Sequence, residues 1–191
     1  MTRPDRILGI SLLLALVLVG CGRSDVNDVN DDEREQVTTV STRPPMEDVL
    51  DRYDAMQRDM VAGLAAELPG LEWRANDDGM GMVRSGCGDD GASPTGEKVS
   101  MLKHAADGTP ARQDWDRAVE IVEEIGRGYG FTDLTPVVDR DEDRIVIGED
   151  GFGGRYRFGM AVNTILSVTT GCHEWETVPS GDYERPSPIV G

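Results

Sequence analysis

Hydrophobic residues recur every three or four positions between residues 46 and 68, which is the spacing of one face of an α-helix. The stripe consists of Met46, Val49, Leu50, Tyr53, Met56, Met60, Val61, Leu64, Ala65 and Leu68. Pro44-Pro45 precedes this stripe and Pro69-Gly70 follows it, so the sequence also predicts where the helix begins and ends. Three methionines on the stripe are compatible with a pliable ligand surface, but core packing is the simpler interpretation.

A second helical pattern follows Thr109-Pro110, where Thr109 can act as the N-cap and Pro110 fits the first turn. Its apolar positions are Trp115, Ala118, Val119, Val122, Ile125 and Tyr129. Gly128 and Gly130 end the pattern. The chain therefore contains two predicted amphipathic helices.

Beyond residue 130 the hydrophobic period shortens to two residues, which is typical of β-strands. We predict strands over residues 71–74, 83–86, 98–102, 134–139, 144–148, 155–160 and 164–170. The last four strands form a meander, in which residues 140–143 are the turn of a hairpin. This order of elements favours an α+β fold with two amphipathic helices packed on one face of an antiparallel sheet.

The first 20 residues have the pattern of a lipoprotein signal peptide. Arg3 and Arg6 precede an apolar run over residues 7–19, and Leu18-Val19-Gly20-Cys21 is a lipobox. We expect cleavage before Cys21 and attachment of a diacylglycerol to its thiol through a thioether, with palmitate among the acyl chains. These acyl chains anchor the protein in the cell membrane, on its extracytoplasmic face. The alternatives are an ordinary signal peptide with an unrelated cysteine, or an uncleaved anchor.

The remainder of the chain divides into three parts by composition. Residues 21–43 are polar and acidic, which predicts a flexible tether. Residues 44–175 carry the periodic segments and form a single α+β domain, and residues 176–191 are a proline-rich tail.

The chain of 191 residues is strongly acidic, with 36 Asp and Glu against 19 Lys and Arg and a net charge of -17. Such a surface repels nucleic acid and anionic lipid headgroups, so neither is an expected partner. The acyl chains on Cys21, rather than surface charge, must hold the protein at the membrane.

Three cysteines are present, and acylation of Cys21 leaves Cys87 and Cys172 as an even pair. In an oxidising compartment the economical interpretation is one disulfide. Closing a loop of about 85 residues stabilises a fold by up to about 4 to 5 kcal/mol when the native geometry is unstrained. Two free or metal-bound thiols are the alternative, although no CxxC motif or paired histidines accompany them.

Three segments carry a family resemblance: MEDVLDRY at residues 46–53, SGCGD at 85–89 and, most specifically, AVNTILSVTTGCH at 161–173. In these segments the sequence resembles the LppA family of mycobacterial and actinobacterial lipoproteins, over about residues 46–173. The resemblance implies a membrane-anchored, exported protein without an established activity. It supports the predicted location and disulfide, and it adds no mechanism.

Metal-binding patterns are weak in this sequence. The two histidines, His104 and His173, are too few for an ordinary metal site, and His173 fits a polar residue at a strand end. Four aspartates fall near the spacing of a calcium loop, namely Asp139, Asp141, Asp143 and Asp150. Arg144 stands where such a loop requires glycine, so weak calcium binding is only a minor alternative.

We therefore expect a non-catalytic envelope lipoprotein that binds an envelope protein or a small apolar ligand outside the cytoplasmic membrane and needs no cofactor. The alternative is an envelope hydrolase that uses clustered carboxylates. Its candidate residues are Glu72, Asp77, Asp78, Asp89 and Asp90. A glycoside hydrolase would hold two such carboxyls about 5 to 9.5 Å apart.

Overall fold

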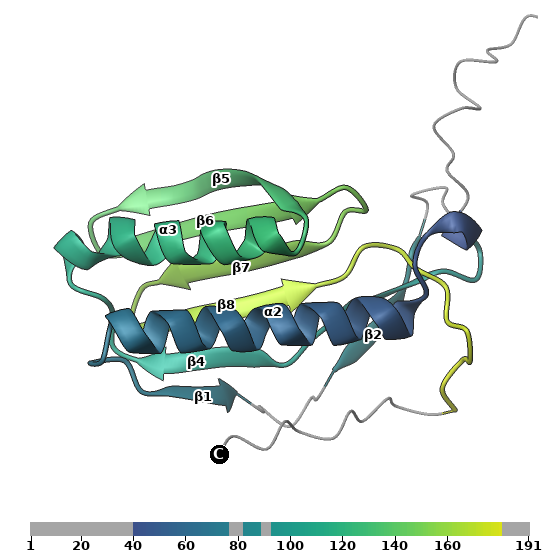
Figure 1. Ribbon diagram of the computed structural model, residues 1–191, viewed down its shortest axis with the longest axis horizontal. Helices are drawn as coiled ribbons and strands as arrows, with labels where there is room; N and C mark the ends of the chain where they lie inside the picture. Colours follow the sequence, from purple (N-terminus) through teal and green to yellow (C-terminus); the bar gives the residue numbers. More distant parts are fainter. Residues whose placement is uncertain (1–39, 77–81, 89–92, 181–191) are drawn as a thin grey trace, which may run out of the picture.

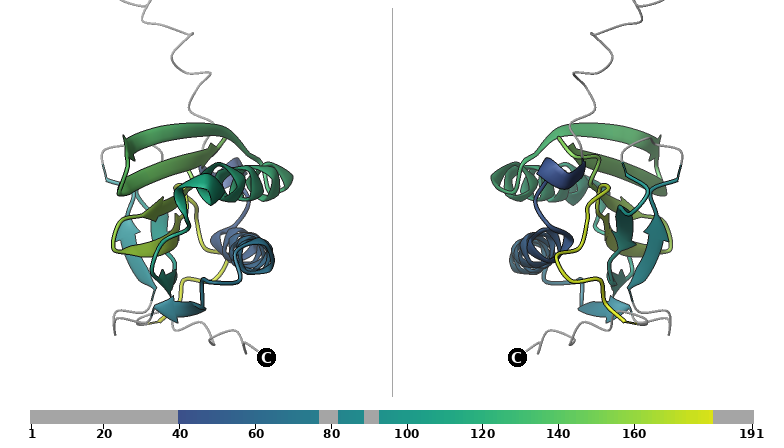
Figure 2. Two further views of the ribbon diagram at one scale, coloured as in Figure 1. Left: turned by 90° about the vertical axis from the view of Figure 1, so that its left-hand side faces the viewer. Right: turned by 90° about the vertical axis from the view of Figure 1, so that its right-hand side faces the viewer.

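Two long helices lie side by side on one face of a twisted antiparallel sheet (Figures 1 and 2). The computed structural model describes residues 40–76, 82–88 and 93–180. In chain order its elements are η1 (Val40–Thr42), α2 (Met46–Glu67), β1 (Trp73–Asn76), β2 (Val83–Gly86), β3 (Glu97–Ser100), β4 (Lys103–Asp107), α3 (Arg112–Gly128), β5 (Phe131–Arg140), β6 (Asp143–Asp150), β7 (Arg155–Met160) and β8 (Asn163–Thr169). This arrangement confirms the predicted α+β class with helices on one face.

The described strands are ordered β1-β4-β8-β7-β6-β5, and every neighbouring pair is antiparallel. The predicted meander is confirmed, because β5 to β8 follow one another across the sheet. The β2–β3 hairpin joins the same sheet through the pair Ser100 and Thr169. Strand β8 therefore lies in the interior of the sheet, between β7 and the β3–β4 segment.

The prediction was wrong between residues 98 and 107, where one strand was expected and two are present. Strand β3 ends at Ser100, and β4 runs from Lys103 to Asp107. Both pair with β8, and their register shifts by one residue between Ser100–Thr169 and His104–Leu166. Strand β4 reads Lys-His-Ala-Ala-Asp, and its small residues give no alternation of large apolar and polar side chains.

Helix α2 follows the predicted apolar stripe except at two positions: Ala65 is exposed, and the polar Gln57 is buried, where its amide N–H donates to Leu102 O (3.0 Å). The three stripe methionines Met46, Met56 and Met60 are fully buried in the main core, which supports core packing over a ligand surface. Trp115 of α3 stacks on Phe158 of β7 with ring centroids 5.3 Å apart, so aromatic contacts join helix and sheet.

Helix α3 begins at Arg112, three residues after the predicted cap, so the prediction that Thr109 caps it is wrong. Ala111 is the N-cap residue, and no side chain caps this helix. The preceding segment is held to β8 instead, because the Thr164 hydroxyl donates to the carbonyl oxygen of Gly108 (2.9 Å). The helix therefore begins after this contact, at Arg112.

Strands β5 and β6 form a hairpin that is longer than predicted, from the pair Phe131–Asp150 at one end to Arg140–Asp143 at the other. Its register shifts between Pro136 and Val138. Proline cannot donate to a ladder, and the edge position of β5 accommodates it. In the part of the chain that the structure describes, no helix has the length and apolarity needed to cross a membrane.

Candidate functional site

The predicted disulfide between Cys87 and Cys172 is present, with Cα atoms 5.8 Å apart and 85 positions between them in sequence. Both cysteines are buried and form a small apolar cluster with Val40, which is only 2% exposed. Gly96 lies against the sulfurs, since a Cβ there would be 2.6 Å from Cys172 Sγ. We call this region, with the residues 43–47, 150–154 and 170–177 that pack around it, the disulfide junction.

Residues 40–43 were assigned to the tether from sequence, but here they contact the folded domain. Arg43 Nη1 donates to the carbonyl oxygens of Cys172 (3.0 Å) and Phe152 (3.3 Å). The backbone N–H of Met46 donates to Glu174 O (2.8 Å), at the start of α2. The chain that enters the domain is thus bonded directly to the segment that carries the second cysteine.

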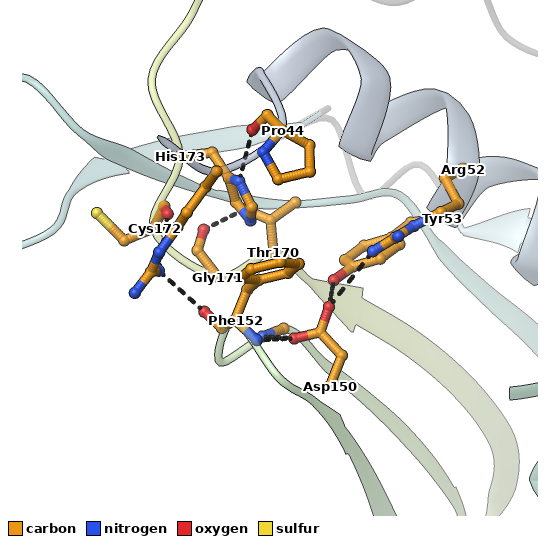
Figure 3. Close-up of polar contacts among 11 residues, drawn as sticks. Pro44, Arg52, Tyr53, Asp150, Phe152, Thr170, Gly171, Cys172 and His173 are labelled. Atoms are coloured by element: carbon orange, nitrogen blue, oxygen red, sulfur yellow. Dashed lines mark hydrogen bonds and ion pairs between the residues drawn. The ribbon is translucent and has the colours of Figure 1, made fainter. Parts of the chain in front are cut away.

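His173 lies at the centre of the junction and is fully buried (Figure 3). Its Nδ1 is 2.9 Å from Pro44 O, and a carbonyl oxygen can only accept, so Nδ1 carries the proton. The other ring nitrogen, Nε2, is buried without a hydrogen-bond partner. Burial is the main cause that lowers the pKa of His173, so the neutral form is favoured. This geometry ties two chain segments together and gives the imidazole no contact with solvent.

Asp150, at the end of β6, has its carboxylate in the same region (Figure 3). Its oxygens accept from the Tyr53 hydroxyl and from the backbone N–H groups of Phe152 (2.9 Å) and Gly154 (2.7 Å). Arg52 Nη2 forms an ion pair with it at 3.6 Å. Burial, followed by the bond to Asp150, raises the pKa of the Tyr53 hydroxyl. The carboxylate therefore orders the β6–β7 turn and joins it to α2.

The calcium-loop hypothesis does not fit this geometry. Asp150 pairs with the first residue of β5, whereas Asp139, Asp141 and Asp143 lie at the opposite end of the hairpin. Those three carboxylates form ion pairs with Arg144, Arg112 and Arg140, respectively. Among the residues that the structure describes, no three His, Cys, Asp or Glu side chains are grouped to hold a metal ion.

Several predicted candidates fall outside the described residues. They are Cys21 and four of the proposed hydrolase carboxylates, Asp77, Asp78, Asp89 and Asp90. The fifth, Glu72, is exposed just before β1. The second histidine, His104, lies on β4, and burial lowers its pKa. The structure does not bring His104 near His173. His104 pairs with Leu166 in β8, whereas His173 lies beyond the end of that strand at Thr169.

Two hollows open on the described surface. One, of about 230 Å³, lies on the sheet face away from the helices and includes Lys103, Arg157, Gly159 and Ile165 in its lining. The other, of about 580 Å³, lies between α3 and the β5–β6 hairpin. Neither Lys103 nor Arg157 belongs to a motif that is recognisable in the sequence. Both residues are cations in a strongly acidic chain, which is the feature that could have drawn attention to them. Their proximity could not be predicted, because strand β4, which carries Lys103, was not predicted.

Comparison with known proteins gives a family and a fold. Residues 23–174 match the model of the LppA family, described as a lipoprotein confined to pathogenic Mycobacterium. The crystal structure of LppA from Mycobacterium tuberculosis is similar, with a TM-score of 0.60 and 18% identity over 78% of this chain and 90% of that one. A DUF4853 family protein from Actinomyces odontolyticus has a TM-score of 0.57 and 19% identity, over 76% and 79% of the two chains. No curated protein matches the sequence.

Proposed function

The chain belongs to the LppA family of lipoproteins, and from this premise we propose that it is a lipid-anchored, non-catalytic binding protein on the extracytoplasmic face of the cell membrane. Acyl chains on Cys21 are its anchor, and residues 21–39 connect them to the folded domain. That connection spans at most about 65 Å when fully extended. The domain therefore works within reach of the membrane surface and does not diffuse away from it.

The observation that carries this proposal is the disulfide junction. Structural disulfides persist in exported proteins and are rare where thiols are kept reduced, so the Cys87–Cys172 bond favours an extracytoplasmic location. Val40 and Arg43 pack and bond at the same junction. The end of the domain at which the chain enters is thus tied to the segment that carries Cys172.

The binding role is supported by the way the described polar groups are used. The His173 imidazole and the Asp150 carboxylate are the chemically versatile groups of the junction, and both are buried in bonds to backbone and tyrosine. A catalyst must reach its substrate, whereas these groups hold chain segments together. Surface hollows on the sheet and beside α3 remain for a ligand.

The test is mass spectrometry of the mature protein from a bacterial host that processes lipoproteins. We expect an amino terminus at Cys21 that carries a diacylglycerol, and no alkylation of Cys87 or Cys172 without reductant. Cys21→Ala should abolish acylation and release the protein from the membrane fraction, while Ser24→Ala should change neither. An unacylated wild-type terminus, or two thiols that alkylate without reduction, would contradict the proposal.

A further inference from the structure

A row of polar side chains crosses three neighbouring strands on the sheet face opposite the helices. Ser167 of β8 pairs with Arg157 of β7. On its other side β8 pairs with β4 as far as His104–Leu166, and Lys103, one residue beyond this pair, lines the same hollow as Ser167. Side chains two residues apart share a face, and Ser167 shares its face with the exposed Ile165. Lys103 and Arg157 therefore come from the strands on either side of Ser167, and all three residues line one hollow.

These two cations lack the acidic partners that most of the described arginines have. Arg155, two residues from Arg157 on the same strand and face, forms an ion pair with Glu149 at 2.6 Å. By contrast, neither Lys103 nor Arg157 has a carboxylate within ion-pair distance in the described chain. In a chain with 36 acidic residues, two neighbouring unpaired cations make a local site that attracts an anion.

An apolar row lies directly beside this pair. The register places Ile165 of β8 between Ala105 and Gly159, and Gly159 next to Ile145 of β6. Ile165 is 42% exposed, so its apolar side chain is accessible to a ligand beside the two cations. A Cβ at Gly159 would lie 3.0 Å from both Arg144 O and Ile145 Cγ1. The absence of a side chain at this position therefore leaves space for the hollow that Gly159 lines.

Both rows line the hollow of about 230 Å³. Asp143 also lines it, at 3.9 Å from Arg140, so the lining keeps an excess of one positive charge. The larger hollow beside α3 differs, because its cations are already paired: Arg112 with Asp141 at 2.8 Å and Arg144 with Asp139 at 3.4 Å. The hollow on the sheet face is therefore the one with unused positive charge.

We propose that this hollow binds a small amphiphilic anion. This proposal rests on the binding role proposed above. The anionic head, a carboxylate or a group of similar charge, lies between Lys103 and Arg157 and accepts a hydrogen bond from the Ser167 hydroxyl. An apolar stem of a few carbons covers Gly159 between Ile145 and Ile165. Charge-assisted hydrogen bonds fix the head, and burial of the stem supplies the hydrophobic part of the affinity.

The position of the hollow favours a small ligand over a peptide strand. Strands β7 and β8 are interior strands, and their backbone groups are used in ladders on both sides. A peptide that adds to a sheet needs the unpaired backbone groups of an edge strand. The volume also falls just below the range of about 300 to 1,000 Å³ that is usual for sites of drug-sized ligands.

The experiment is a chemical-shift titration of the full mature chain carrying Cys21→Ser, which has no acyl chains and needs no detergent. The probes are hexanoate, acetate, which has the head alone, and 1-hexanol, which has the stem alone. We expect saturable shifts with hexanoate, confined to β4, β7 and β8, and weaker binding of both partial probes. Arg157→Gln should weaken hexanoate binding about threefold to fivefold, which is the upper part of the range for one exposed ion pair.

Arg155→Gln is the matched control, because it removes the same charge from the same strand and face but from an arginine that is already paired. It should leave hexanoate affinity within about twofold. Equal weakening by both variants, binding of 1-hexanol as tight as that of hexanoate, or no shifts on the sheet would overturn the inference. Tighter binding of an acidic peptide at the same residues would overturn it as well. The titration does not depend on acylation, so its failure leaves the anchoring result unchanged, and the reverse holds too.

Discussion

Removal of the disulfide offers the most quantitative test of the fold. The variant is Cys87→Ala with Cys172→Ala, which deletes the only crosslink that the described residues contain. The bond closes a loop with a sequence separation of 85, and the loss of chain entropy in the unfolded state is then worth about 4 to 5 kcal/mol. Because the native contacts around the cysteines include the backbone bonds between Glu97 and His173, the folded geometry should persist without the crosslink.

The free energy of unfolding is measured by urea titration of the full mature chain with Cys21→Ser. Trp115 and Trp175 are buried, so their fluorescence reports loss of the core. We expect a loss of about 4 to 5 kcal/mol, and a melting temperature lower by about 10 to 20 °C for a domain of this size.

The control is a reductant. It should destabilise the protein that keeps both cysteines by a similar amount and leave the double-alanine variant unchanged. A loss below about 1 kcal/mol in the variant would refute the reasoning, because an 85-residue loop would then add almost nothing to the entropy of the unfolded chain.

Three further changes test the packing around the junction and the core. Tyr53→Phe removes the buried hydroxyl that bonds to Asp150, and should cost about 1 to 3 kcal/mol in urea unfolding, whereas Tyr129→Phe removes an exposed bond and should cost about 0.5 kcal/mol or less. Burial lowers the pKa of His173 in the folded state, so stability should fall as the pH drops below about 6.5, the unfolded value, and His173→Gln should reduce that slope; an unchanged slope would contradict this assignment. A Cβ at Gly148 would lie 2.2 Å from a buried tyrosine ring, so Gly148→Ala should lower the melting temperature by several degrees, equivalent to about 1 to 3 kcal/mol.

The sequence predicted best those elements that large side chains define locally. Helix α2 was placed within one residue, because its apolar stripe is long and prolines stand at both ends. Strands β2 and β7 were placed with their observed bounds, Val83–Gly86 and Arg155–Met160. In β7 the alternation of Tyr156, Phe158 and Met160 with charged or small residues is strong enough to fix the strand alone.

The missed elements depend on tertiary contacts. Strand β4 has only alanines at its buried positions, and its pairing with β1 and β8 supplies the stabilisation that its side chains lack. Helix α3 was expected to begin at Thr109, but the preceding segment is bonded to β8. Neither contact is visible from spacing along the chain.

The same limit applies to the sites. The cysteine pair was predictable because few residue types pair in that way and only two thiols remained. The bonds from Arg43 to Cys172 join residues 129 positions apart, and the row formed by Lys103, Ser167 and Arg157 requires the strand order. Such proximities follow from topology, which local patterns do not encode.

The disulfide junction also determines how the domain responds to mechanical load. A pull on the chain at Val40 loads the backbone that leads to α2 and, in parallel, the hydrogen bonds from Arg43 to the carbonyl oxygens of Cys172 and Phe152. Because Cys172 is bonded to Cys87, part of the force passes to the segments that follow β8 and β2, and the first turn of α2 does not carry all of it. A protein held at a moving surface by its amino-terminal side can in this way keep its core intact under tension.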